Sequence, residues 1–414
     1  MFEDLTNQLN ELLKNYQYTD THFTSVIISD RITTEVLDEL PRDYMVICDD
    51  NLKGLALSIF PGERIVSLGN NLIADVVHVE QLVKNNSSNT LVAFGSGTIN
   101  DICKYASFKM GRNYYLFPTA ASMNGYLSCF ASLKLGGHSQ SFRAQLPKTV
   151  YVALDVIEDA PKRLYYSGIG DLLCSVNTHL EWWLASLYSN NGYSAELASL
   201  LEGLENDFLE GLVLEEMSRV KFLQLMKLIF YSGLVMTITG SSSSASQSEH
   251  GFVHAFDLLY PKVASELLHG EKVAYFTQYS LKMWQKLIKV DDLYSCLDSN
   301  KYFMYLQKLN VGLRGVIAPE SLQKTIDNKI AVVAAIKKFA GNEKKSWHKV
   351  ISNVISALGN SRYYSRVKIL SIVAARLEQR LLSNLRVENA IKLSPFIRDR
   401  FTIADLCMLT FTKN

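Results

Sequence analysis

Short apolar runs alternate with helical patterns over the first third of the chain. The apolar runs are rich in β-branched or aromatic residues and end in turn or capping residues, as buried strands do. Helical patterns separate them, most clearly from Asn71 to Lys84 and from Thr98 to Gly111. Strands and helices that alternate at this spacing predict a parallel sheet covered on both faces. The predicted strands are residues 24–29, 44–50, 64–68, 89–97, 113–120 and 148–155.

The pattern changes after about residue 155. Long segments with the 3.6-residue period of helices follow, and clear strands disappear. The chain has 414 residues, which is too long for one ordinary core. We therefore predict two domains, an α/β domain over residues 1–158 and an all-helical domain over residues 159–414. The predicted helices of the second domain are residues 172–188, 197–216, 219–236, 272–288 and 365–382.

Composition favours a globular protein. Hydrophobic residues make up 48% of the chain and charged residues 20%, which argues against disorder. The net charge of +1 gives no reason to expect nucleic acid or an anionic membrane as a partner. The most membrane-like run, residues 222–240, contains Lys227, Gly233 and several hydroxyl residues. We therefore interpret it as a buried helix and not as a membrane span.

The cysteines and the N-terminus indicate a cytoplasmic protein. The first 18 residues carry acids and amides and lack the continuous apolar core of a secretory signal. The six cysteines form no C-x-x-C pair and mostly lie in apolar surroundings, which is typical of small buried residues in a reducing compartment. They are Cys48, Cys103, Cys129, Cys174, Cys296 and Cys407.

A glycine-containing turn joins a predicted strand to a predicted helix in the stretch LVAFGSGTINDICK, residues 91–104. Glycines allow the backbone to approach a phosphate closely, and the free amides at a helix start favour an anion. The strand-turn-helix context makes Gly95, Ser96 and Gly97 a candidate phosphate-binding turn. A tight turn without a ligand is the alternative interpretation.

Two carboxylates follow the predicted strand that ends near residue 48. A carboxylate at the end of an early strand commonly holds a ribose hydroxyl, and Asp49 and Asp50 are both candidates. The sequence Asp-Asp-Asn is also ordinary turn chemistry, so both interpretations stay open.

Three of the eight histidines fall within residues 246–270. His250 and His254 are four residues apart and share a face if this segment is helical. His269 lies near the start of the next predicted helix, so imidazoles from two adjacent helices could meet. Two imidazoles and one carboxylate are a common catalytic metal set that leaves a position open for substrate. A pair of hydrogen-bonded core histidines is the alternative.

Asp171 is the candidate carboxylate, because it follows a Gly-x-Gly turn and opens an apolar helix in the stretch SGIGDLLCSVNTHLEW. A plain N-cap would explain the same residue. Taken together, the segments that contain Asp171, His250 and His269 favour a metal site.

Several segments of the chain resemble a known superfamily, that of the iron-containing alcohol dehydrogenases, glycerol dehydrogenases and dehydroquinate synthases. Within it the chain is most similar to the sn-glycerol-1-phosphate dehydrogenase family. The similar segments follow the family order and cover most of the chain from about residue 44. They are GSGTINDICKYAS, PTAASMNGYLSCFAS, SGIGDLL with EWW, GLVMTITGSSSSASQSEHGFVHAFD, LLHGEKVA and IRDRFTIADL.

The resemblance implies a nucleotide-binding α/β domain, a helical domain that binds metal and substrate, and an active site in the cleft between them. It implies that Asp171, His250 and His269 bind one divalent metal, with zinc expected first and iron or nickel as alternatives. It places His254 beside the substrate and the nicotinamide. The positions that match cofactor-binding residues are Asp49, Gly95, Ser96, Gly97, Asn100, Asp101, Thr119, Ser122 and Ser128.

The chain departs from the family at one position close to the reacting hydroxyl. The family usually has Asp in the P-T-x-x-S-x-D stretch, where this chain has Asn124. An amide can orient a hydroxyl but cannot accept its proton, so the usual proton relay and the substrate are both in question. We therefore count Asn124 with His254 as the candidate catalytic residues.

The resemblance implies reversible, metal-dependent hydride transfer between NAD or NADP and a secondary alcohol. The expected substrate is a small phosphorylated polyol, sn-glycerol 1-phosphate, which is oxidised to dihydroxyacetone phosphate. Asp49 would repel a 2′-phosphate if it contacts the ribose, which favours NAD over NADP. A homo-oligomer is left open.

Three alternatives stay open. The first is a dehydrogenase of another polyol or of an aldehyde. The second is a dehydroquinate synthase-like cyclase, although the Gly-Gly-Gly-Val turn and the Val-Asp-Ser-Ser-Val-Gly-Gly-Lys stretch of the cyclases are absent. The third is a binding protein or scaffold on the inherited fold, which Asn124 would favour.

Overall fold

The computed structural model describes residues 3–18, 22–86, 90–136, 138–290, 297–313, 319–342, 344–377, 383–397 and 400–411. Packing contacts divide the chain into two units. Unit 1 comprises Met1–Leu172 and Ser199–Ser242, and unit 2 comprises Leu173–Ala198 and Ser243–Asn414. Beyond the predicted division at residue 158, residues 159–172 and 199–242 group with the sheet in unit 1.

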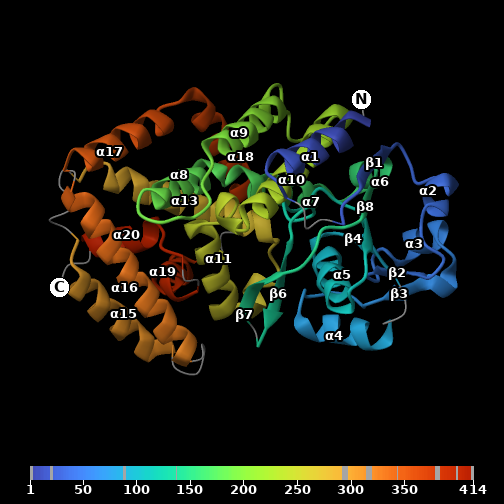
Figure 1. The fold of residues 1–414 in the computed structure, drawn as a ribbon, viewed down its shortest axis with the longest axis horizontal. Coiled ribbons are helices and arrows are strands. Elements are labelled where there is room, and N and C mark those ends of the chain that lie inside the picture. The colour runs from blue at the N-terminus through green and yellow to red at the C-terminus, as the bar shows by residue number, and fades with distance from the viewer. Residues whose placement is uncertain are drawn as a thin grey trace. The chain divides into compact units, whose positions relative to one another are not determined.

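The six predicted strands form one parallel sheet in unit 1, which confirms the predicted fold class (Figure 1). Every neighbouring pair in the sheet is parallel, and the order is β1-β8-β5-β4-β2-β3. The strands are β1 (Ser25–Ser29), β2 (Tyr44–Cys48), β3 (Ile65–Ser67), β4 (Thr90–Gly95), β5 (Tyr114–Pro118) and β8 (Thr149–Ala153).

Both faces of the sheet are buried at strands β4, β5 and β8, which explains why these strands are continuous apolar runs. Side chains alternate between the faces of a strand. Phe94 and Phe117 lie on one face and pack with Phe60, which directly follows α3 (Lys53–Ile59), with ring centroids 5.5 and 5.6 Å from Phe60. On the other face, Ala93 and Leu116 are fully buried, and α5 (Gly97–Met110) packs against β4 and β5.

The remaining helices of unit 1 include one whose start differs from the prediction. The helix predicted from Asn71 begins at Val76, because the Asp75 side chain accepts the His78 amide hydrogen at 2.9 Å and Asn71 itself has a left-handed φ of 51°. These helices are α1 (Glu3–Asn15), α2 (Thr34–Asp38), α4 (Val76–Asn85), α6 (Leu154–Asp159), α7 (Lys162–Leu173), α9 (Ala195–Leu209), whose first four residues group with unit 2, and α10 (Arg219–Thr239).

Helix α10 contains the run that we interpreted as a buried helix. Among the described residues it is one helix that is long and apolar enough to cross a membrane, and 72% of its apolar stretch is buried inside the protein. Gly240 follows it with a left-handed φ of 61° and accounts for its end. The burial is typical of a core helix.

A two-stranded antiparallel hairpin, β6 (Phe130–Leu135) and β7 (His138–Arg143), was not predicted. Its second strand reads HSQSFR and lacks the apolar run of a buried strand. Lys134 of β6 forms an isolated parallel β-bridge with Asp75, the residue directly before α4. The hairpin is therefore joined to the segment that leads into α4.

The described part of unit 2 is helical, as predicted. Helix α13 is central, because it packs against α8, α11, α18 and α20. Trp284 on α13 is fully buried. The helix predicted over residues 365–382 begins at Ser361, and residues 378–382 lie outside the described residues. The helices are α8 (Ser175–Ser186), α11 (Ser248–Leu259), α12 (Pro261–Ala264), α13 (His269–Leu287), α15 (Ser299–Leu313), α16 (Pro319–Asn342), α17 (Lys344–Leu358), α18 (Ser361–Ala375), α19 (Asn384–Leu393) and α20 (Ile403–Phe411).

A buried ion pair joins α16 to α20. Lys329 Nζ lies 2.6 Å from Asp405 Oδ1, and both side chains are at most 1% exposed. The Tyr302 hydroxyl donates to the same carboxylate oxygen, and Thr402 donates its backbone and side-chain hydrogens to the other oxygen. The carboxylate is therefore satisfied on both sides, and it fixes the start of α20.

Candidate active site

The Gly-Ser-Gly turn joins the carboxyl end of β4 to the start of α5. A Cβ on Gly95 would lie 2.7 Å from the Ile99 Cβ, and one on Gly97 would lie 2.8 Å from the Met123 Cγ. The Ile99 contact favours glycine at Gly95 before any ligand is considered, whereas the flexible Met123 side chain near Gly97 could shift. Phosphate binding by Gly95, Ser96 and Gly97 therefore stays a prediction.

The turn occupies the position in the sheet where open α/β folds bind ligands. The chain passes from β2 to β3 on one side and from β4 to β5 on the other, so the order of the strands reverses between β2 and β4. The carboxyl ends of these two strands carry Asp49 and Gly95. Asp49 accepts a hydrogen bond from the Leu52 amide at 3.0 Å, and Asp50 accepts one from the Ser67 hydroxyl at 2.5 Å, so both make turn contacts.

Asn100 and Asp101 point into unit 1. Asn100 is fully buried and its side-chain oxygen accepts a hydrogen bond from the Tyr114 hydroxyl at 3.2 Å. Asp101 accepts the Ser132 amide hydrogen at 2.9 Å, and Lys104 lies 3.4 Å from its other oxygen. Burial raises the pKa of Asp101, and the Lys104 charge opposes that effect. These contacts give both residues a structural role.

Two glycines hold the loop of residues 119–128, which follows β5 in unit 1. A Cβ on Gly168 of α7 would lie only 2.0 Å from the Ala121 carbonyl oxygen. One on Gly233 of α10 would lie 2.9 Å from the Leu127 carbonyl carbon. Both helices can approach the loop backbone only because these side chains are absent.

Hydrogen bonds fix the same loop. The Thr237 hydroxyl on α10 donates to the Leu127 carbonyl at 3.0 Å and accepts the Cys129 amide hydrogen at 2.8 Å. Three predicted cofactor residues also have partners within unit 1: the Thr119 amide donates to Gly95, the Ser122 hydroxyl lies 3.4 Å from the Tyr126 hydroxyl, and Ser128 accepts the Phe130 amide hydrogen. Their cofactor role stays a prediction.

Asp171 lies in the last turn of α7, so the prediction that it opens a helix after a glycine turn is wrong. The helix begins at Lys162 and continues through Gly168, whose missing side chain serves the contact with the loop and not a turn. Asp171 Oδ2 accepts the backbone hydrogen of Asn124 at 3.1 Å. The carboxylate thus fixes the backbone of the residue at which the chain departs from the family.

Unit 2 contains the three histidines of residues 246–270. His250 and His254 lie on α11 and His269 begins α13. The ring centroids of His250 and His269 are 5.1 Å apart, whereas His254 lies 6.4 Å from His250 and 6.2 Å from His269. Two imidazoles bound to one tetrahedral zinc at about 2.1 Å would place their centroids ~5.2 Å apart. The His250–His269 separation therefore fits two ligands of one cation, and His254 lies farther out.

A buried carboxylate contacts the first of these histidines. Glu249 is fully buried, and its Oε1 lies 2.8 Å from His250 Nδ1. Burial opposes the charge on Glu249, but the hydrogen bond and the charge of His250 outweigh it and lower its pKa. Burial, together with the nearby Glu249 charge, raises the pKa of Glu181 on α8 to about 8. The negative charge of this carboxyl pair therefore lies preferentially on Glu249.

Each unit therefore assembles part of the predicted site. Unit 1 places the Gly-Ser-Gly turn, the loop with Asn124, and Asp171 on one framework, and unit 2 places the three histidines together. The predicted convergence of Asp171 with His250 and His269 involves both units and stays a prediction. The sequence indicated a turn at Gly168 and no role for Gly233 or Glu249; the one sequence signal for Glu249 was its position directly before a candidate ligand.

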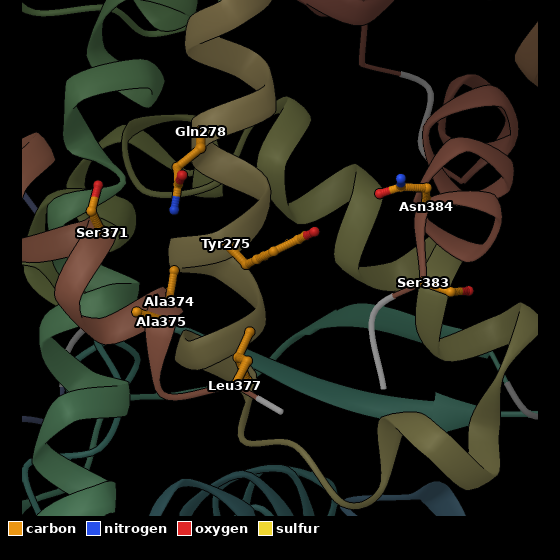
Figure 2. Close-up of a pocket in the computed structure, with 8 residues that line it drawn as sticks. All are labelled: Tyr275, Gln278, Ser371, Ala374, Ala375, Leu377, Ser383 and Asn384. Carbon is orange, nitrogen blue, oxygen red and sulfur yellow. The ribbon is translucent and has the colours of Figure 1, made fainter. Parts of the chain in front are cut away.

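A cavity of about 530 Å³ lies elsewhere in unit 2 (Figure 2). Figure 2 shows Tyr275 and Gln278 of α13 beside the end of α18 and the start of α19. None of the predicted site residues lines it, so we assign it no part in the chemistry. Its lining residues are Tyr275, Gln278, Ser371, Ala374, Ala375, Leu377, Ser383 and Asn384.

Comparisons with known proteins show what the chain is similar to in sequence and in fold. Residues 3–161 match the family model described as iron-containing alcohol dehydrogenase. A solved iron-containing alcohol dehydrogenase from Corynebacterium glutamicum superposes with a TM-score of 0.53 at 13% identity and covers 94% of both chains. A probable glycerol dehydrogenase from Sinorhizobium meliloti gives 0.51 at 17% identity, over 84% of this chain and 96% of that one. Residues 3–161 are therefore similar to the iron-containing alcohol dehydrogenases in sequence, and the chain shares its fold with these solved structures.

The chain is also similar in sequence to curated proteins named glycerol-1-phosphate dehydrogenase. The chain is 35% identical over 203 residues to glycerol-1-phosphate dehydrogenase [NAD(P)+] of Sulfurisphaera tokodaii, over 49% of this chain and 57% of that protein. It is 34% identical over 201 residues to the enzyme of the same name from Pyrococcus furiosus, over 48% and 57%. The matched region thus spans less than two thirds of these relatives.

Proposed function

We propose that this protein is an NAD(P)-dependent and metal-dependent dehydrogenase. Its proposed substrate is the secondary alcohol of a small phosphorylated polyol, with sn-glycerol 1-phosphate and dihydroxyacetone phosphate as the first pair to test. The observation that carries the proposal is the 5.1 Å separation of the His250 and His269 rings, which suits two ligands of one cation. The similarity to glycerol-1-phosphate dehydrogenases supports the substrate class.

We propose that Asp171 supplies the third ligand of that cation. When bound, a divalent cation supplies a Lewis acid for the substrate oxygen, and a nicotinamide dinucleotide accepts or returns the hydride. Zinc is the proposed metal because imidazole and carboxylate are ligands that it prefers. The amides at the start of α5 would hold the dinucleotide phosphates at the switch point of the sheet.

Asn124 and His254 have different roles in this proposal. The Asn124 amide can orient the substrate hydroxyl but cannot accept its proton. His254 lies beside the proposed ligand pair, with its ring 6.2 Å from that of His269. Its imidazole is therefore the group of this chain that would take up the proton from the hydroxyl.

Metal content and turnover test the ligand set together. Purified wild-type protein should contain about one divalent ion per chain, measured by elemental analysis. Asp171→Ala, His250→Ala and His269→Ala should each lose both the ion and the activity. His348→Ala removes an exposed histidine of unit 2 and should keep both. A His269→Ala variant that keeps full activity without metal would refute the proposal.

A substrate panel tests the reaction. Glycerol 1-phosphate, glycerol 3-phosphate, glycerol and dihydroxyacetone phosphate are each assayed with both cofactors. Turnover of glycerol 1-phosphate with NADH accumulation is the expected result, and a preference for glycerol would indicate another polyol dehydrogenase. Cofactor reduction that never accumulates would indicate a cyclase, because a cyclase regenerates its NAD.

We also propose a cytoplasmic location. The five described cysteines are buried and are not in disulfides, which suits a reducing compartment, and Cys296 lies outside the described residues. Fractionation of cells that express the tagged protein would test this.

A further inference from the structure

The buried carboxylate of Glu249 is committed to hydrogen bonds on both of its oxygens. Oε1 accepts the Gln247 backbone hydrogen at 2.6 Å and faces His250 Nδ1 at 2.8 Å. Oε2 accepts a hydrogen bond from the Asn177 side-chain amide. The Gln247 amide and the Asn177 side chain thus both donate hydrogen bonds to this carboxylate.

Asn177 is itself held in one orientation. Its side-chain oxygen accepts the indole hydrogen of Trp284 at 2.9 Å, which leaves the amide NH₂ directed at the carboxylates. That NH₂ also lies 2.7 Å from Glu181 Oε1 and 3.2 Å from the Ser248 hydroxyl. Helices α8 and α13 therefore fix the position of the Glu249 carboxylate on α11.

We propose that Glu249 is a positioning residue that holds the hydrogen of His250 on Nδ1 and so presents the Nε2 lone pair as a metal ligand. A carboxylate accepts hydrogen bonds and does not donate them, so the nitrogen that faces it carries the hydrogen. Carboxylate partners commonly orient ligand histidines in this way and strengthen their bond to the metal. The inference rests on the proposed function, because the ligand role of His250 belongs to it.

A different use of the same residues would be a second cation site. Ligand atoms of Cys174, Glu249 and His250 lie within 4.8 Å of one another, and all three residues are buried. A cation there would have to displace the hydrogen bonds from Gln247 and Asn177 to the carboxylate. The donors around Glu249 therefore favour positioning over coordination.

The first test reads the tautomer of His250 in the metal-free protein. Nitrogen NMR of the imidazole should show a protonated Nδ1 and a bare Nε2 in the wild type at a pH where the ring is neutral. Glu249→Leu should shift the population toward the Nε2–H form. Leucine is close in volume, and it removes a buried charge next to Glu181, so the variant is expected to fold. Glu249→Ala provides a second truncation.

The second test measures zinc affinity by competition with a chromophoric chelator. Both truncations should weaken zinc binding by about 10- to 100-fold. Glu181→Gln is the matched control, since it alters a carboxylate of the same cluster that does not contact His250, and should leave both tautomer and affinity unchanged. Cys174→Ala should also leave zinc affinity unchanged, and a loss there would overturn the inference in favour of coordination.

The outcomes separate this inference from the proposed function. If His250→Ala loses zinc but both Glu249 truncations keep the wild-type tautomer and affinity, the positioning role is refuted and the metal site stands. If His250→Ala binds zinc as tightly as the wild type, the metal site and the positioning role both fail. A shifted tautomer together with weakened zinc binding supports both.

Discussion

The contact between α7 and the loop of residues 119–128 can be tested with a single methyl group. Gly168→Ala would place a Cβ 2.0 Å from the Ala121 carbonyl oxygen, whereas carbon and oxygen normally stay more than 3 Å apart. The obstacle is backbone on both sides, so no side chain can rotate away. The helix or the loop must therefore move by more than about 1 Å.

The structure ranks three glycine substitutions in unit 1. Overpacking typically costs 1–3 kcal/mol, and we expect Gly168→Ala to lower the free energy of unfolding by about 3 kcal/mol. Gly233→Ala brings its Cβ to 2.9 Å from the loop backbone and should cost about 1–2 kcal/mol. Gly203→Ala on α9 meets nothing within 4 Å and should gain roughly 0.5–1 kcal/mol, because alanine is the better helix former.

Urea titration followed by circular dichroism would measure the three values, with Gly203→Ala as the matched control for the same substitution on a helix. Fluorescence titration of NADH would add a second readout. Displacement of α7 should also break the Asp171–Asn124 hydrogen bond and weaken cofactor binding if the loop contacts the dinucleotide. Equal stability of the Gly168→Ala and Gly203→Ala proteins would refute the packing argument.

Three further predictions concern buried polar groups. Thr237→Val removes the hydroxyl that bonds the Leu127 carbonyl and the Cys129 amide and should lower the free energy of unfolding by about 1–3 kcal/mol; an unchanged urea midpoint would contradict this. Lys329→Met leaves the Asp405 carboxylate buried without its cation and should cost ~3–5 kcal/mol, a loss that the double variant Lys329→Met/Asp405→Leu should largely reverse. Glu181 has a pKa raised from 4.5 to about 8 in the folded protein. Its proton therefore stabilises the fold fully below about pH 4.5, and this contribution is lost by up to about 1.4 kcal/mol per pH unit as pH rises toward 8. Glu181→Gln should show a smaller fall in urea midpoint over that range, and parallel curves would exclude the effect.

The parallel sheet could be predicted because a strand that is buried on both faces needs apolar residues at successive positions. Such continuous apolar runs can be recognised in the sequence. The histidine cluster could be predicted in part, since His250 and His254 share one helical face by spacing alone. The position of Asp171 could not, because the sequence SGIGD has the glycines of a turn. Gly168 instead lies within a helix and allows that helix to contact the loop backbone at Ala121. Ala121 lies nearly fifty residues earlier in the chain, so the local sequence does not indicate this contact.

The polar cluster around Glu249 could not be predicted for a related reason. Its members come from α8, α11 and α13, and no local pattern links Asn177 to Trp284. The β6–β7 hairpin was missed because its second strand is polar and contacts neighbours that its own sequence does not indicate. Local periodicity indicates the helices and strands and their buried faces. Which polar side chains become buried and hydrogen-bonded depends on residues far away along the chain.

Two contacts of helix α7 depend on the same helical rotation: that of Gly168 with Ala121 and that of Asp171 with Asn124. Gly168 and Asp171 are three residues apart, so the glycine that meets Ala121 also sets the angle at which the carboxylate reaches Asn124. Each residue of an α-helix turns the chain by about 100°. An insertion or deletion of a single residue between them would swing the carboxylate away from its partner, so this stretch can diverge by substitution but not by changes in length.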